Sequence, residues 1–506
     1  MSNRKEKPVN ILLFFTDQQR GDTIHALGND IIETPNMDRL VREGVAFERA
    51  FTPSPVCVPG RCSMYYGLYP HHTGCADNGD PGPKDRPTMM ELLTKEGYRT
   101  HGIGKMHFSP DGQALCGFQS RERQEEGVAR AEDDDYLQYL LEKGYTHVFD
   151  PHGQRSEMYY IPQLSQLPAR DHPTQWVGDR SIEFIRNHDF SKPFFLMSSF
   201  IHPHPPFTPP TPWNKIYRAK DMPHAHVPEN YEDCLTYMNH FQNRYKYRDQ
   251  GIDRNLLRTQ KAFYYSCISF IDYQIGRILQ QLEELGQLDN TLIILTADHG
   301  ELLGDYNSFG KRSMLNSAAR IPMIVRFPVK MEKGMQCSKP VSLVDVMPTA
   351  LDAAGIDAGD LSLDGESLIK IASGEARREY VISQFQKDGL GLYMIATEDK
   401  KYFYSAPDDK EYYFDNVADP METKNLMSSE GSPEAADLKK ELIRVLRESG
   451  QDGAVDGEEW RKYPKRKMPE DPDEGLLFQD HLFGRERETL LPDGYTVKYP
   501  PFKFDM

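Results

Sequence analysis

The sequence lacks the features that mark several common classes of protein. It has no run of the roughly 18 to 20 apolar residues that crossing a bilayer requires. Its first apolar run, residues 11–15, is far too short for a secretion signal. The seven cysteines form no C-x-x-C pair, which argues against a disulfide framework or a structural zinc site. We therefore expect no membrane partner and a cytoplasmic location, or a periplasmic or secreted one if an export signal has been removed.

The sequence also has fewer basic than acidic side chains. The 506 residues include 60 basic and 77 acidic side chains, which gives a formal net charge of −17. This balance repels phosphate backbones and anionic membranes, so we expect no nucleic-acid partner. The G-x-x-x-x-G-K-[ST] and H-E-x-x-H patterns are absent as well, so the sequence offers no signature of a P-loop nucleotide site or of a zinc protease.

What the sequence does contain is an alternation of short apolar runs and longer amphipathic stretches. This pattern is typical of an α/β fold, with a large, mixed but mostly parallel sheet flanked by helices. The chain exceeds the roughly 250 to 300 residues at which a single core stops growing, so a second unit is expected. The predicted strands are residues 10–16, 45–52, 98–103, 193–200, 291–297 and 321–327, and the predicted helices are residues 34–43, 88–96, 176–187 and 260–285.

The pattern changes toward the C-terminus. Four short runs, residues 380–385, 390–397, 401–404 and 411–414, predict a small antiparallel sheet, and residues 433–448 predict an amphipathic helix after it. We divide the chain into a catalytic α/β domain, residues 1–374, and a C-terminal α+β subdomain, residues 375–506, whose tail from Gly450 onward we expect to have little regular structure. Two polar stretches, residues 120–171 and 210–258, are long for connections, so they either wall a substrate site or decorate the surface.

Polar side chains follow most of the predicted strands of the large sheet. The first strand leads into Asp17 and Gln18, and three later strands lead into Lys105 and His107, into His202 and His204, and into Asp298 and His299. Ligands of open α/β sheets bind beyond the carboxyl ends of the strands, so we expect these groups to converge. Each also has a plain structural reading, since an Asp after a strand often caps a helix and histidines occur in rigid proline-rich loops.

The segment after the second strand carries a candidate nucleophile. Pro59 favours the first turn of a helix, which would place Cys57 near the helix N-terminus, where free N–H groups stabilise an anion. Arg61 adds a positive charge one turn on. On these grounds Cys57 is either a thiolate nucleophile of lowered pKa or a buried structural cysteine.

Cys57-Val58-Pro59-Gly60-Arg61 resembles the C-x-P-x-R signature of the type I sulfatases, which belong to the alkaline-phosphatase superfamily. Further blocks resemble that family in the family's order: residues 10–17, 34–40, 67–70, 104–107, 296–301, 344–349 and 413–426. The resemblance covers about residues 8–430, and the combination of motifs is far more specific than any one of them.

The resemblance implies a modified nucleophile. In the family the motif cysteine is oxidised to formylglycine by a dedicated formylglycine-generating enzyme, which would therefore be a partner during maturation. One hydroxyl of the hydrated aldehyde at position 57 would attack the sulfur of a sulfate ester. His204 would protonate the leaving alcohol, and His107 would take the proton of the second hydroxyl so that sulfate is expelled. We favour His204 over His202 as the acid because its neighbours match the family pattern, which leaves His202 to contact substrate.

The resemblance also implies one divalent metal ion, held by Asp17, Gln18, Asp298 and His299, with Lys105, Lys311 and Arg61 supplying further positive charge. Oxygen ligands favour Ca²⁺ or Mg²⁺, and the family most often uses Ca²⁺. Three positions depart from the family: Gly60 replaces the commoner Ser or Ala, Gln18 the usual second Asp, and His299 the usual Asn. With these changes Mn²⁺ is a further candidate for the metal ion, and His299 could contact substrate instead of the metal.

The predicted activity is hydrolysis of a sulfate monoester, of a small molecule or a carbohydrate. The alternatives are a phosphonate or phosphate ester hydrolase of the same superfamily and a non-catalytic protein that binds sulfated sugars. The pair Lys105 and His107 favours the sulfatase, because the phosphonate branch typically lacks it. Since the net charge would repel a long polyanion, we expect a small or lightly sulfated substrate. The identity of the alcohol and the oligomeric state are not encoded in any motif.

Overall fold

The computed structural model describes residues 8–126, 130–148, 150–155, 159–246, 253–428 and 432–471. Its centre is an eight-stranded sheet of order β4-β3-β5-β1-β6-β7-β2-β8, in which only β7 runs antiparallel to its neighbours. The strands are β1 (Asn10–Asp17), β2 (Val45–Phe51), β3 (Arg99–Gly104), β4 (Ser120–Arg123), β5 (Phe194–Pro203), β6 (Thr291–Ala297), β7 (Met323–Arg326) and β8 (Met335–Ser342). The predicted mixed, mostly parallel sheet is confirmed.

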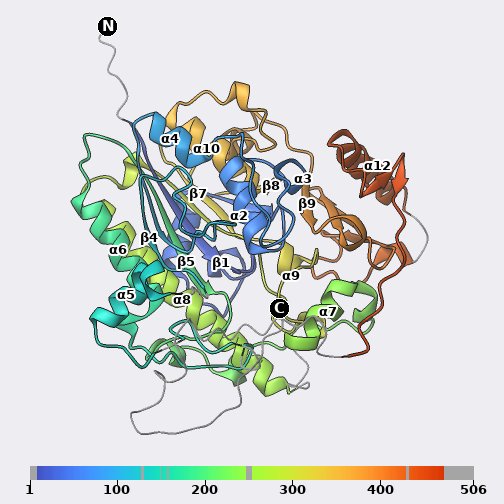
Figure 1. The fold of residues 1–506 in the computed structure, drawn as a ribbon, viewed down its shortest axis with the longest axis horizontal. Helices are drawn as coiled ribbons and strands as arrows, with labels where there is room; N and C mark the ends of the chain where they lie inside the picture. Colours follow the sequence, from blue (N-terminus) through green and yellow to red (C-terminus); the bar gives the residue numbers. More distant parts are fainter. Residues whose placement is uncertain are drawn as a thin grey trace.

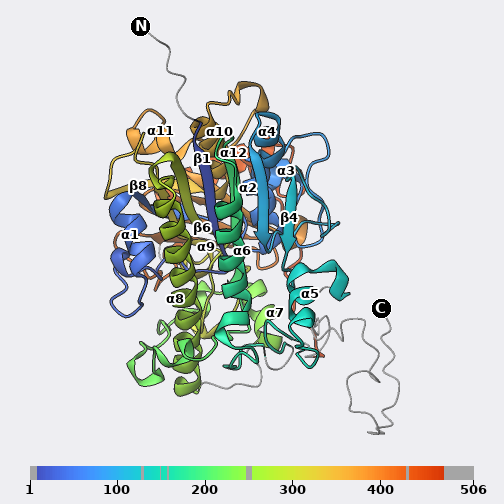
Figure 2. The same cartoon turned by 90° about the vertical axis from the view of Figure 1, so that its left-hand side faces the viewer.

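Helices cover both faces of this sheet. The long helix α8 (Arg254–Glu284) lies beside α6 (Pro173–Asn187) on one face, with α1 (Pro35–Glu43) next to them (Figure 2). Helices α2 (Cys57–Tyr66), α4 (Met89–Lys95) and α10 (Val346–Ala354) pack on the other. Because successive side chains of a strand point to opposite faces, Leu12 and Phe14 of β1 join the first core and Leu13 and Phe15 the second.

The observed elements differ from the predicted ones where polar residues interrupt the apolar pattern. Helix α8 begins at Arg254 and not near residue 260, because the Asp253 side chain accepts the N–H groups of Asn255 and Leu256 and so caps an earlier first turn. Strands β4 and β8 were not predicted. Every residue of β4 is only half-buried, and β8 contains Pro340 and alternates irregularly between buried and exposed positions.

A second, antiparallel sheet of order β12-β11-β10-β9 follows in the chain. It is built from β9 (Val381–Phe385), β10 (Leu392–Ala396), β11 (Lys400–Ser405) and β12 (Lys410–Asp415), and α12 (Pro433–Glu448) packs on it, as predicted (Figure 1). The tail after Gly450 is more regular than expected where it is described. It forms a hairpin of β13 (Val455–Asp456) and β14 (Glu459–Trp460), and Trp460 is buried against Tyr393 and Tyr404. Residues 472–506 of the predicted tail lie outside the described part.

The described helices include none that combines the length and the hydropathy needed to cross a bilayer.

Candidate active site

Cys57 is the first residue of α2, which follows the loop after β2, as the position of Pro59 predicts. Its thiol is 2% exposed and lies 2.9 Å from Lys311 Nζ and 3.2 Å from His299 Nε2. Burial opposes ionisation of the thiol. The charges of Lys311, Lys105 and His299 and a hydrogen bond from His107 outweigh burial and hold the pKa of Cys57 well below its ordinary value. Position 57 is therefore built for an anion.

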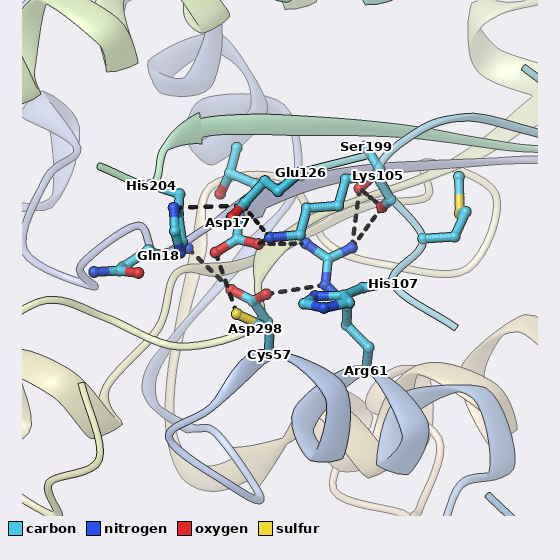
Figure 3. Close-up of polar contacts among 12 residues, drawn as sticks. Asp17, Gln18, Cys57, Arg61, Lys105, His107, Glu126, Ser199, His204 and Asp298 are labelled. Carbon is cyan, nitrogen blue, oxygen red and sulfur yellow. Dashed lines mark hydrogen bonds and ion pairs between the residues drawn. The ribbon is translucent and has the colours of Figure 1, made fainter. Parts of the chain in front are cut away.

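Arg61, one turn further along α2, ties the nucleophile's helix to two strand ends (Figure 3). Its guanidinium contacts Asp298 at 3.0 Å and Asp17 at 3.1 Å, and all three side chains are fully buried. It also donates to the carbonyl oxygen of Lys105 at 2.6 Å and to Ser199 Oγ at 3.2 Å. Four of its five N–H donors are thus used by protein groups, so Arg61 positions the two carboxylates.

Lys105 follows β3 and is fully buried between two carboxylates. Its Nζ lies 2.6 Å from Asp17 and forms an ion pair with Glu126. Burial disfavours the charged amine, but Asp17 and Glu126 raise the pKa of Lys105 above its ordinary value. Lys105 is a permanent cation next to the nucleophile.

The histidines predicted to move protons or to contact substrate are placed differently. His204 Nδ1 bonds the carbonyl oxygen of Pro205 at 2.7 Å and lies 3.4 Å from Glu126, and its Nε2 is 3.5 Å from the Tyr159 hydroxyl. His107 helps to lower the pKa of Cys57, has a left-handed backbone (φ 54°), and has a buried Nδ1 without a partner among the described residues. Both therefore flank the centre of the site.

His202 instead faces into the protein. Its Nε2 lies 3.0 Å from Thr208 Oγ1 and its Nδ1 lies 3.4 Å from Thr174 Oγ1, so both ring nitrogens are used within the fold. We withdraw the expectation that His202 contacts substrate.

Asp17, Asp298, His299 and Cys57 form a candidate metal site, with ligand atoms that all lie within 4.8 Å of one another. Burial and the neighbouring Asp17 raise the pKa of Asp298, a sign of repulsion between the two carboxylates that a cation would relieve. The donor set of two carboxylates and one imidazole therefore fits a divalent ion. Gln18, also predicted as a ligand, lies beside this group, with its amide oxygen 3.0 Å from Lys311 Nζ.

Several residues of the site were not predicted. Glu126 pairs with Lys105 and also with Arg155 at 2.6 Å. Glu126 and Arg155 both come from the long polar stretch of residues 120–171. Burial opposes ionisation of Glu126, but His204, Lys105 and Arg155 hold its pKa well below the usual range. Glu301, which lies three residues after Asp298, accepts a hydrogen bond from the side-chain amide of Gln18. The only sequence signal for Glu126 and Arg155 was the unusual length of that connection.

Comparison with known proteins identifies the relatives of this chain. The sulfatase family model matches residues 9–356, and a model of the C-terminal part of N-sulphoglucosamine sulphohydrolase matches residues 304–451. An arylsulfatase of Clostridium perfringens is 35% identical over 481 residues, which cover 90% of this chain and 98% of the relative. An N-acetylglucosamine-6-O-sulfatase of Bacteroides thetaiotaomicron is 28% identical and covers 88% of this chain and 86% of its own length.

Among solved structures, the phosphonate monoester hydrolase of Agrobacterium radiobacter superposes with a TM-score of 0.76 at 25% identity, covering 90% of this chain and 100% of that one. The two chains therefore have similar folds. The family match extends over most of the large sheet and over every predicted catalytic position, and a relative above 30% identity spans nearly the whole chain. The chain belongs to the sulfatase family, within the alkaline-phosphatase superfamily.

Proposed function

We propose that this protein hydrolyses a sulfate monoester, with residue 57 acting as the nucleophile after its oxidation from cysteine to formylglycine. The observation that carries the proposal is the placement of Cys57 at the N-terminus of α2, directly against Lys311, His299 and His107. The formylglycine, once hydrated, supplies a hydroxyl nucleophile that can later release sulfate without attack by water. The proposal includes a formylglycine-generating enzyme as a partner in maturation.

Lys311 and Lys105 are the residues that receive the sulfate group. Lys311 Nζ lies 2.9 Å from the side chain of residue 57, and Lys105 Nζ is held on the same carboxylate, Asp17, that faces the nucleophile. Two fixed ammonium groups stabilise the charge that builds on the sulfuryl oxygens during transfer, and they do so in a site that excludes water. Arg61 is assigned to positioning Asp17 and Asp298, because it is fully buried and four of its five N–H donors bond protein groups.

His204 and His107 move the protons. The bond of His204 Nδ1 to the Pro205 carbonyl requires the hydrogen to sit on Nδ1, so Nε2 is the atom that carries the proton given to the leaving alcohol. Glu126, 3.4 Å from Nδ1, stabilises the positively charged ring. His107 is among the groups that lower the pKa of residue 57, and we assign it as the base that takes the proton of this residue in the second half of the reaction.

Asp17, Asp298 and His299, with the oxygen of Gln18, would hold one divalent ion, for which we propose Ca²⁺, with Mg²⁺ or Mn²⁺ as alternatives. Such an ion acts as a Lewis acid and neutralises negative charge. The ammonium group of Lys311 lies 3.0 Å from the amide oxygen of Gln18 and so fixes which end of the amide is the oxygen.

The substrate is proposed to be a small or lightly sulfated molecule. The nucleophile, Lys105, His204 and Lys311 are each at most 5% exposed, and Glu126 pairs with both Lys105 and Arg155, so little room is left for a long chain. The relatives bear names of enzymes for aryl sulfates and for a 6-sulfated amino sugar, which makes both classes suitable first substrates.

The test combines mass spectrometry with paired assays. A peptide containing residue 57, taken from the native enzyme, should show the mass of formylglycine, and the intact thiol alone would exclude the proposed nucleophile. The same preparation should hydrolyse 4-nitrophenyl sulfate faster than an aryl phosphonate ester. A faster reaction with the phosphonate would favour the alternative that the structural similarity to a phosphonate monoester hydrolase raises.

A further inference from the structure

One buried carboxylate outside the catalytic group, Glu301, connects three parts of the site. Glu301 is fully buried and lies three residues after Asp298. Its Oε1 accepts the backbone N–H groups of Leu303 and Gly310, and its Oε2 accepts the Tyr160 hydroxyl at 2.8 Å and the side-chain amide of Gln18. Every group that faces Glu301 is a donor, so it serves as an acceptor alone and all four of its lone-pair positions are used.

The contacts of Gln18 on both sides fix the orientation of its amide. The carboxylate of Glu301 can only accept, so the NH₂ end of the amide must face it. The ammonium group of Lys311 can only donate, and it lies 3.0 Å from the other end, so that end must be the oxygen. Two independent partners therefore demand the same orientation, which directs the oxygen of Gln18 toward Lys311.

Two further observations show that this arrangement is specific. Gln18 has a left-handed backbone (φ 68°), a strained conformation for a residue with a side chain, and its N–H donates to Asp298 at 2.9 Å. Gly310, which donates to Glu301, directly precedes Lys311 in the chain. One carboxylate thus fixes both the amide of Gln18 and the loop that presents Lys311.

We propose that Glu301 is a positioning residue of the active site, which keeps Gln18 in the orientation that offers oxygen to the metal ion and holds the loop of Lys311 against the nucleophile. This inference rests on the proposed function for its catalytic consequences. Tyr160, from the long polar stretch of residues 120–171, donates to the same carboxylate, so that stretch contributes to the site through Tyr160 as well as through Glu126 and Arg155.

Glu301→Gln is the direct perturbation. The backbone N–H groups of Leu303 and Gly310 keep the new amide oxygen, so its NH₂ group must face the NH₂ group of Gln18. Two donors cannot bond each other, and Gln18 should turn its oxygen away from Lys311. We expect the affinity for Ca²⁺, measured by titration calorimetry on the full-length chain, to fall about 10- to 100-fold, with a similar fall in kcat.

The reciprocal pair Gln18→Glu with Glu301→Gln separates positioning from simple structural support. In the double variant the amide of residue 301 donates to the carboxylate of residue 18, whose second oxygen faces Lys311 as before. We expect the double variant to recover at least about tenfold of the affinity lost by Glu301→Gln. Gln18→Glu alone sets two buried carboxylates against each other and should also bind Ca²⁺ less tightly than the double variant.

Glu422→Gln provides a matched control. Glu422 is also fully buried and accepts a backbone N–H, that of Asn316, but it pairs with Lys401 of β11, away from the nucleophile. Its variant should lower the melting temperature without changing the affinity for Ca²⁺. Unchanged affinity and kcat in Glu301→Gln, or a double variant no better than either single variant, would overturn the inference. Because calorimetry needs no turnover, an unaltered chain that binds Ca²⁺ but fails to cleave sulfate esters would count against the proposed function alone.

Discussion

Replacing His204 tests the division of labour proposed for the two histidines. Burial lowers the pKa of His204 to about 4 although Glu126 favours its protonated form. Protonating the ring at pH 7 would therefore cost about 4 kcal/mol, because each pH unit above the pKa costs roughly 1.36 kcal/mol. The ring can therefore act as an acid only if the bound sulfate adds negative charge beside it, which raises its pKa in the complex.

The consequence is a dependence on the leaving group. His204→Ala should lower kcat/KM about 10²- to 10⁴-fold for an alkyl or sugar sulfate, whose alkoxide must be protonated, a range typical of general acid catalysis. It should affect 4-nitrophenyl sulfate far less, since nitrophenolate leaves without a proton. Steady-state rates with both substrates measure the effect, and the Tyr159→Phe variant, which keeps His204 and removes only its hydroxyl neighbour, serves as the control.

The pH profile supplies the second half of this test. Because the acid must be protonated, kcat/KM of the unaltered enzyme with a sugar sulfate should fall as pH rises above the pKa of free His204, and the corresponding fall in kcat should occur at higher pH. Equal losses with both substrates in His204→Ala, or an unchanged descending limb, would refute the assignment of His204 as the acid.

Three further predictions follow from the packing. Arg61→Ala leaves the buried pair Asp17 and Asp298 without their shared cation, so urea unfolding should show a loss of about 3 to 5 kcal/mol, part of which added Ca²⁺ restores. Burial lowers the pKa of His152 to about 3 and that of His202 to about 4, so the unfolded chain binds more protons below pH 6.5. The free energy of unfolding should then decrease as the pH is lowered from 6 to 5, by about 1 kcal/mol per pH unit for each ring. A urea midpoint that stays constant over this range would contradict the prediction. Trp460→Ala should cost about 3 to 5 kcal/mol in the same assay without changing kcat, because Trp460 stacks on the small sheet far along the chain from the catalytic residues.

The strands and the ends of the strands could be read from the sequence because both depend on local chemistry. Apolar runs such as Thr291–Ala297 form buried strands wherever they are covered, and the polar residues that follow them must lie at the carboxyl edge of a parallel sheet. Asp17, Lys105 and Asp298 therefore meet as predicted. Pro59 likewise set the start of α2 and so the environment of Cys57.

What only the tertiary structure decided is which way side chains turn once these edges meet. His202 and His204 are two residues apart in the same segment, yet packing against Thr174 and Thr208 takes His202 out of the site while Glu126 and Tyr159 hold His204 in it. Glu301 and Glu126 became visible as parts of the site only through partners such as Gln18 and Lys105, 283 and 21 positions away in the chain. The sequence by itself determined the chemistry available at the sheet edge, because that follows from residue type and local periodicity. The orientation of each group depends on contacts between distant segments, which no local pattern encodes.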